Sequence, residues 1–107
     1  MSQERLKAEI AKKALEICED RIMSKSGVAL PEIMGSIQVQ LEWLVSYFEG
    51  KNSEREKLKT LVFGHYALRE VDESDEEFIG ALSKAYYVAD QTSKGLKIDL
   101  KVIVGDS

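Results

Sequence analysis

The side chains best able to do chemistry in this chain of 107 residues are a dense run of carboxylates between positions 70 and 77. Six of these eight residues are acidic: Glu70, Asp72, Glu73, Asp75, Glu76 and Glu77. Acids in the first turn of a helix are favoured by the helix dipole, and charged runs are commonly just solvated. However, Glu70, Asp72 and Glu73 precede the expected helix cap at Ser74, so the dipole does not explain them. The alternative is an anionic surface for a basic partner.

Other reactive groups are few and isolated. His65 lies three residues after Val62 and three before Leu68, which predicts a partly buried core histidine. Cys18 sits among apolar residues in mid-helix and is expected to be an inert core thiol. One cysteine and one histidine cannot supply a four-ligand zinc site. The acidic run lacks the glycine and ligand spacing of a calcium loop, and the dispersed glycines form no phosphate-binding loop. The sequence therefore predicts no enzyme, no metal and no cofactor.

Composition and charge bound the class of protein. The chain is 44% hydrophobic and 32% charged, which is typical of a globular domain in aqueous solution. A chain of this length is expected to form one domain, residues 1–107, with a radius of gyration near ~13 Å. The net charge of −4 and the scattered Lys and Arg residues argue against nucleic-acid binding. No signal peptide and no apolar run of membrane-spanning length is visible, so we expect a cytoplasmic protein.

Apolar residues recur at helical spacing through most of the chain, and they predict a four-helix, bundle-like, all-α domain. The expected helices span about residues 2–25, 31–50, 53–69 and 75–94. Pro31 opens the second helix, where its missing N–H is tolerated. Ser53 with Glu56, and Ser74 with Glu77, read as capping boxes for the third and fourth helices.

Two glycines mark further features. Gly64 interrupts the third expected helix, which would be offset by a close crossing of two helices at that point. After Gly95 the apolar period changes to two over residues 96–104, which predicts a strand in a short extended tail, residues 95–107. Because no second strand is visible, the tail could pair with a second copy in a homodimer, add to a partner's sheet, or lie across the helices.

A series of short motifs between residues 61 and 100 resembles a known family. The motifs are Leu61–Gly64, Glu70–Asp75, Ala85–Val88 and Thr92–Asp99. In this order they are similar to the small helical immunity proteins of interbacterial antagonism by type VI secretion. The founding member of that family neutralises an effector that hydrolyses NAD and NADP, and a relative is the antidote to a toxin that pyrophosphorylates adenosine nucleotides.

The resemblance implies an immunity protein that occludes the active site of a cognate, nucleotide-targeting toxin and performs no catalysis. A toxin pocket that binds NAD or ATP presents cations to the phosphates, and an acidic protein can occupy it in their place. The candidate partner-binding residues are Glu70, Asp72, Glu73, Asp75, Glu76 and Tyr87. Tyr87 is included because Tyr86 and Tyr87 point about 100° apart on a helix, so both can hardly be core. The alternative function is a helical adaptor or chaperone-like dimer.

Overall fold

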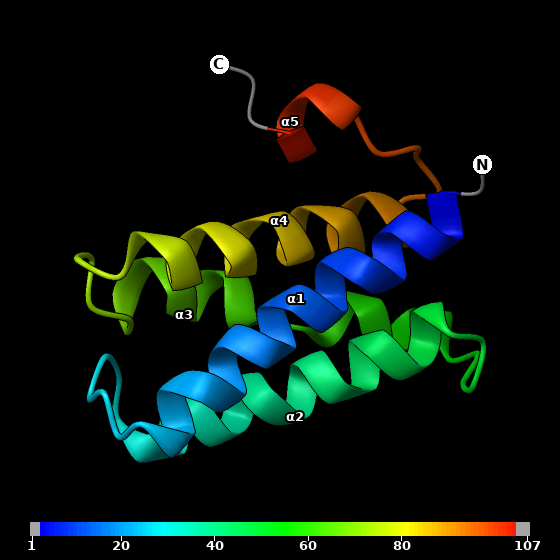
Figure 1. The fold of residues 1–107 in the computed structure, drawn as a ribbon. Helices are drawn as coiled ribbons and strands as arrows, with labels where there is room; N and C mark the ends of the chain where they lie inside the picture. Colours follow the sequence, from blue (N-terminus) through cyan, green and yellow to red (C-terminus); the bar gives the residue numbers. More distant parts are fainter. Residues whose placement is uncertain (1–2, 105–107) are drawn as a thin grey trace.

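Helices account for all the regular structure of residues 3–104, the part of the chain that the computed structural model describes. In chain order they are α1 (Gln3–Met23), α2 (Pro31–Phe48), the 3₁₀-helix η1 (Arg55–Thr60), α3 (Phe63–Arg69), α4 (Glu76–Ser93) and α5 (Leu100–Val104) (Figure 1). No strand occurs between residues 3 and 104. The prediction of an all-α domain is confirmed.

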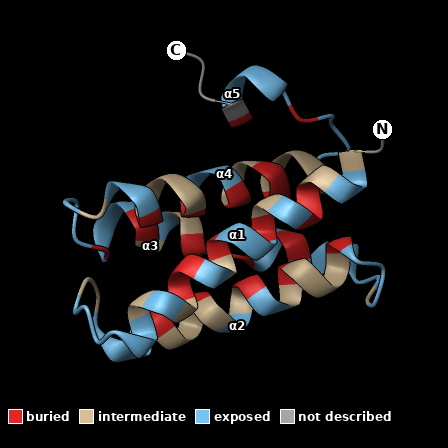
Figure 2. Ribbon diagram, viewed as in Figure 1, coloured by how far each residue is buried: buried red, intermediate tan, exposed pale blue. Residues whose placement is uncertain are grey.

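The core lies among α1, α2, α3 and α4. α1 packs against both α2 and α4, and α3 packs against α4 and α2. Buried residues line the facing sides of these helices, and exposed residues line their outer sides (Figure 2). The largest fully buried side chains are Phe63, Phe78, Ile37, Leu41, Leu44, Leu82, Val88 and Cys18. The Cα radius of gyration is 13.1 Å, as expected for one core of this length.

Three of the expected helices form close to their predicted bounds. α2 begins at Pro31, whose ring suits the first helical position. α4 ends at Ser93, and Gly95 follows with φ +72°, the left-handed conformation that commonly terminates helices. α1 ends at Met23, slightly before the predicted end, and Gly27 also has a positive φ.

The prediction of one continuous third helix over residues 53–69 was wrong. The chain instead forms η1, becomes extended at Leu61, and starts again as α3 at Phe63. The Gln40 side chain stabilises the start of α3, because its Oε1 accepts the backbone N–H groups of Val62 (2.8 Å) and Phe63 (3.0 Å). The break changes which side chains face inward. Phe63 and Ala67 are buried, whereas the predicted core positions Val62, His65 and Leu68 are exposed.

Neither capping box forms as predicted. The 3₁₀-helix η1 has Glu54 at its N-cap position and no side-chain cap. The cap of α4 is Asp75, one residue after the predicted Ser74, and it accepts the N–H of Phe78 at 3.3 Å. Ser74 instead donates its hydroxyl hydrogen to Asp72. Aspartate and serine are nearly equal as caps, so tertiary contacts to Asp75 decide between the neighbours.

The tail does not form the predicted strand, so residues 96–104 offer no strand that could pair with a second copy or with a partner's sheet. Residues 96–99 are held by side chains rather than by a neighbouring strand: Gln3 Oε1 accepts the Ile98 N–H at 3.3 Å, and the Tyr87 hydroxyl accepts the Asp99 N–H at 2.9 Å. Asp99 Oδ1 then accepts the N–H of Lys101, within the short helix α5. Residues 105–107 of the predicted tail lie outside the described residues.

The predicted close crossing at Gly64 is confirmed. A Cβ atom added to Gly64 would overlap the ring of Tyr86 on α4. The same ring packs edge-on against Phe63, with 5.5 Å between ring centroids. Glycine at position 64 therefore lets α3 lie directly on the aromatic face of α4.

We expect Gly64→Ala to destabilise the fold by about 1–3 kcal/mol, because the Tyr86 ring must move to admit a methyl group. Gly80→Ala is the matched control. Gly80 is also helical, but nothing lies within 4 Å of an added Cβ. The control should be neutral or stabilising by up to about 1 kcal/mol through helix propensity. Urea unfolding of both variants measures the difference, and equal free energies of unfolding would contradict the close crossing.

Candidate functional site

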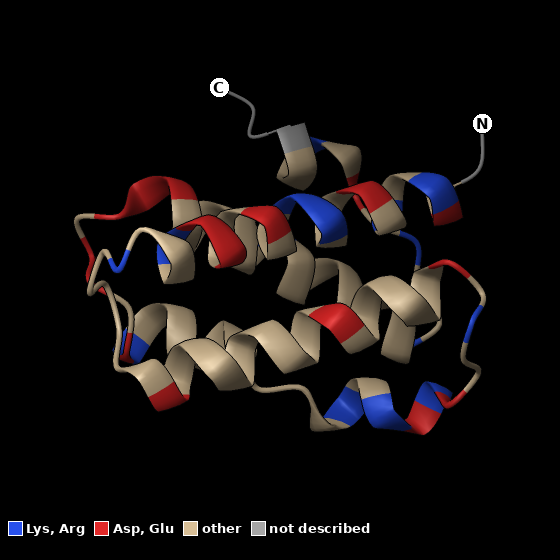
Figure 3. Cartoon of the chain, turned by 60° about the horizontal axis from the view of Figure 1, so that its bottom comes forward, with Lys and Arg blue, Asp and Glu red and all other residues tan. Residues whose placement is uncertain are grey.

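The candidate site is the acidic segment, residues 70–77, which joins α3 to α4 at one end of the molecule. In Figure 3, acidic residues gather on this connection and on the start of α4, while Lys and Arg occur on η1 towards the other end. The segment is held to the body at two points. Val71 is buried, and the Asp72 N–H donates to the carbonyl of Val28 at 2.7 Å. The acidic segment is therefore positioned by the connection between α1 and α2.

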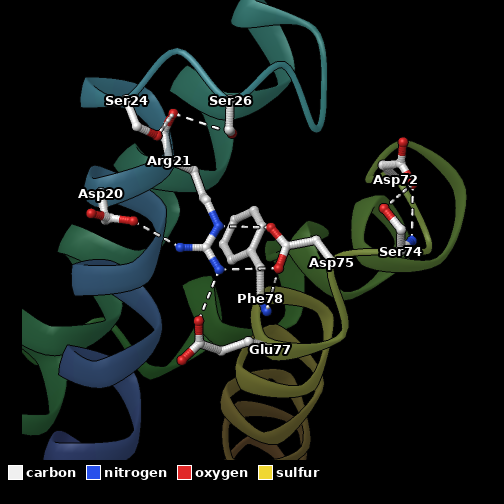
Figure 4. Close-up of polar contacts among 9 residues, drawn as sticks. All are labelled: Asp20, Arg21, Ser24, Ser26, Asp72, Ser74, Asp75, Glu77 and Phe78. Atoms are coloured by element: carbon white, nitrogen blue, oxygen red, sulfur yellow. Dashed lines mark hydrogen bonds and ion pairs between the residues drawn. The ribbon is translucent and has the colours of Figure 1, made fainter.

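Arg21, near the end of α1, is the principal partner of the acidic segment (Figure 4). Its Nε and Nη2 lie 2.7 and 3.1 Å from the two carboxylate oxygens of Asp75. Nη2 also lies 2.9 Å from Glu77, and Nη1 lies 2.8 Å from Asp20. The Arg21 side chain is only 18% exposed and that of Asp75 only 10%. A two-point contact of this kind fixes geometry as well as charge.

The contacts of Arg21 and Asp75 shift both ionisation equilibria. The hydrogen-bonded guanidinium of Arg21 lowers the pKa of Asp75, and the Phe78 N–H lowers it further. The hydrogen bonds that Arg21 donates to Asp75, Glu77 and Asp20 raise the pKa of Arg21. The ion pair is therefore fully charged at neutral pH, and Asp75 serves as both helix cap and ion-pair partner.

The Asp72 carboxylate also makes hydrogen bonds within the chain. Its Oδ1 accepts the backbone N–H of Ser74 at 2.9 Å and the Ser74 hydroxyl at 2.8 Å. These hydrogen bonds, with the backbone one first, lower the pKa of Asp72. Asp72 thus shapes the turn before α4 while remaining exposed.

The remaining candidate acids stay on the surface. Glu70, Glu73 and Glu76 are exposed, and none of them makes an ion pair with another described residue. Of the five predicted acidic residues, the structure therefore assigns Asp72 and Asp75 to internal contacts and leaves three carboxylates facing solvent. Three uncompensated charges within seven residues produce a local negative potential.

Tyr87 lies on α4 and is half-buried. Its hydroxyl holds the Asp99 N–H, so it positions the chain after α4 instead of joining the acidic segment. Tyr87 also lines a groove of about 330 Å³ between α3 and α4, together with Leu68, which is 79% exposed. An aromatic ring beside an exposed leucine is a surface suited to a protein contact.

The structure places the two isolated reactive residues, His65 and Cys18, at different depths. His65 was predicted to be partly buried but is exposed, with its Nε2 3.4 Å from the hydroxyl of Tyr86. Cys18 is buried as predicted, and burial raises the pKa of its thiol to about 11, so it is almost entirely protonated at neutral pH. Within residues 3–104 no three His, Cys, Asp or Glu side chains are grouped so that they could hold a metal ion. None of the helices in the same range is long and apolar enough to cross a membrane.

The partners that the sequence analysis missed are Arg21 and Gln40. Arg21 is separated from Asp75 by 54 positions, and Gln40 from Val62 by 22. A single arginine in the last turn of one helix and one of the two glutamines of another give no local signal. The position of Arg21 in the last turn of α1 suits the helix dipole, which is the only reason that the sequence supplies for it.

The fold and the site define a small helical protein with an exposed acidic end and a groove suited to protein contacts. The chain belongs to the Tsi6 family, which it matches over residues 7–91, from α1 to the last turns of α4. The immune protein Tsi6 of Pseudomonas aeruginosa is 36% identical over 88 residues, covering 82% of this chain and 90% of that protein. A chain in the solved structure of Tse6 in complex with Tsi6 is 34% identical, with a TM-score of 0.76, over 87% of this chain and 96% of that one.

We expect Asp75→Asn to lower the free energy of unfolding by about 1.5–3 kcal/mol at pH 7, because asparagine still caps α4 but loses the charged contact with Arg21. Since the pKa of Asp75 is lower in the folded state, its contribution is complete above an unfolded pKa near ~3.9 and is lost as the pH falls through the folded value. The wild type and Asp75→Asn should therefore converge in stability as the pH falls towards about 2.

Urea unfolding at a series of pH values checks this expectation. Glu73→Gln is the control, since Glu73 is an exposed acid of the same segment with no ion pair among the described residues. It should leave the free energy of unfolding nearly unchanged at pH 7. A difference between wild type and Asp75→Asn that does not depend on pH would contradict the role of the charged pair.

Proposed function

We propose that this chain is an immunity protein, which binds the cognate toxin of a type VI secretion effector and occludes the toxin's active site. The observation that carries the proposal is membership of the Tsi6 family across α1 to α4. The P. aeruginosa relative is an immune protein, and the related fold has been solved in complex with Tse6. By the resemblance of its motifs, the chain's own toxin is one that acts on nucleotides.

The exposed carboxylates of the acidic segment supply a physical basis for binding such a toxin. A protein site for NAD or ATP must present cations and N–H donors to the phosphates. Glu70, Glu73 and Glu76 offer negative charge to such a site without losing contacts in their own fold. Opposite potentials also speed the encounter of the two proteins. We therefore place the toxin's cationic rim against these three residues.

Asp72, Asp75 and Tyr87 act indirectly in this proposal. Asp72 shapes the turn, and Asp75 fixes the start of α4 against Arg21. Tyr87 presents its ring to the groove beside Leu68, where a partner side chain can pack. Charged residues then set the approach, while the half-buried aromatic ring slows dissociation.

Occlusion of the toxin requires no catalysis by the immunity protein. In this proposal the immunity protein acts in the cytoplasm, where the toxin's nucleotide substrates are. The protein should abolish the activity of its toxin at a near-equimolar ratio and turn over no nucleotide by itself. A titration of toxin activity against added protein measures the ratio. Full protection by trace amounts would identify an enzyme instead. The absence of any inhibition or complex would favour the alternative of a helical adaptor.

Neutralising the exposed acids tests the binding surface. We expect Glu70→Gln, Glu73→Gln and Glu76→Gln together to slow association with the toxin by about tenfold at low salt and to flatten its salt dependence. The triple variant Glu42→Gln, Glu54→Gln and Glu56→Gln is a matched control, because these acids are also exposed, form no ion pair with another described residue, and give the same change in net charge.

Surface plasmon resonance at several salt concentrations measures both triple variants. At about 0.15 M salt, where the Debye length is about 8 Å, the control should associate within about twofold of the wild type, because charges farther from the interface are screened. Equal association rates for the two triple variants would place the toxin interface elsewhere on the molecule.

A further inference from the structure

A second polar feature lies away from the acidic segment. A pocket of about 470 Å³ opens between the start of α1, the 3₁₀-helix η1 and the chain that follows α4. This volume is within the range of small-molecule sites. Three of its lining residues are cationic, Lys7, Arg55 and Lys97, and one is acidic, Glu4. In a chain whose net charge is −4, this pocket has the opposite sign.

Lys7 is the sole charged residue buried among the described positions. Its side chain is 7% exposed, and its ammonium lies 5.9 Å from the centroid of the Phe48 ring. Its ion pair with Glu4 is long, at 3.4 Å, compared with about 2.7–2.9 Å for strong charged hydrogen bonds. Removing an ammonium from water is unfavourable unless its donors are satisfied, and an ammonium has three. A bound anion would compensate Lys7 at the floor of the pocket.

The other two cations are also available to a ligand. Arg55 gives one Nη2–H bond, at 3.1 Å, to the carbonyl of Thr92, and neither Arg55 nor Lys97 forms an ion pair within residues 3–104. That Arg55 bond also occupies a carbonyl at the negative end of α4, which would otherwise repel an anion. Guanidinium and ammonium groups together are the usual recognition set for carboxylate and phosphate oxygens.

We propose that this pocket binds a small polyanion that carries two or more carboxylate or phosphate groups. Lys7 contacts one anionic group at the floor, and Arg55 and Lys97 hold a second group at the mouth. Glu4, whose side chain is 65% exposed, remains at the edge of the pocket. The site is separate from the acidic segment and does not depend on toxin binding, so the two proposals can fail independently.

Titration of the purified, ¹⁵N-labelled protein with sodium pyrophosphate and with sodium citrate tests the proposal. Ionic strength is held constant with sodium chloride. We expect saturable shifts of amide signals around Lys7, Arg55 and Lys97, together with a rise in melting temperature. Tighter binding of pyrophosphate identifies phosphate as the preferred group, and tighter binding of citrate identifies carboxylate. Shifts that never saturate, or that are spread over the whole surface, would overturn the site.

Variants locate the binding. Arg55→Gln combined with Lys97→Gln should weaken the apparent affinity at least about tenfold, since two charged contacts are lost. Lys25→Gln combined with Lys84→Gln makes the same change in net charge at exposed positions outside the pocket, and it should leave the affinity within about twofold. Lys97→Gln alone avoids disturbing the Arg55–Thr92 contact, so it gives a reading even where the double variant is unstable. Equal weakening by both double variants would reduce the effect to general charge attraction and overturn the proposal.

Discussion

The contact between Arg21 and Asp75 is the interaction on which the arrangement of this protein's acidic end depends. It joins the last turn of α1 to the cap of α4, two elements 54 positions apart, and it lies mostly shielded from water. A bidentate guanidinium–carboxylate pair fixes both distance and orientation. It therefore holds the capping carboxylate of α4 in one orientation against the end of α1.

The same contact determines how the charge of the acidic segment is divided. Asp75 and Glu77 are neutralised in part by Arg21, and Asp72 is occupied by the turn that it forms with Ser74. The glutamates between and before these residues have no such partners among the described residues. Short aspartate side chains therefore build the segment, while the longer glutamates give it its external charge. These glutamates, which would face a cationic partner, can therefore be substituted without removing a contact that holds the fold.

The packing of α3 is governed by two contacts of a different kind. Gly64 has no side chain to collide with Tyr86, and the Gln40 Oε1 atom accepts the first two N–H groups at the start of the helix. Together they allow a helix of only seven residues to be stable against α4. An isolated helix of that length is not stable in water, so its stability comes from the tertiary structure. Gly64 and Tyr86, the two residues of this close approach, both line the groove between α3 and α4.

By itself, the sequence determined the helical class, the bounds of α2 and α4, the burial of Cys18 and the close crossing at Gly64. These features follow from periodicity, from Pro31 and Gly95, and from side-chain size, all of which act over a few residues. The density of carboxylates in the acidic segment was also visible in the sequence, and the motifs around it pointed to the family.

Only the tertiary structure decided which of these carboxylates are free, where the third predicted helix breaks, and that the tail is not a strand. In each case a side chain distant in sequence satisfies backbone or charged groups. Arg21 pairs with Asp75, and Gln40 accepts hydrogen bonds from the start of α3. Gln3 and Tyr87 accept hydrogen bonds from the chain after α4. Local sequence patterns do not identify such partners, because a hydrogen bond depends on distance in space and not on separation along the chain.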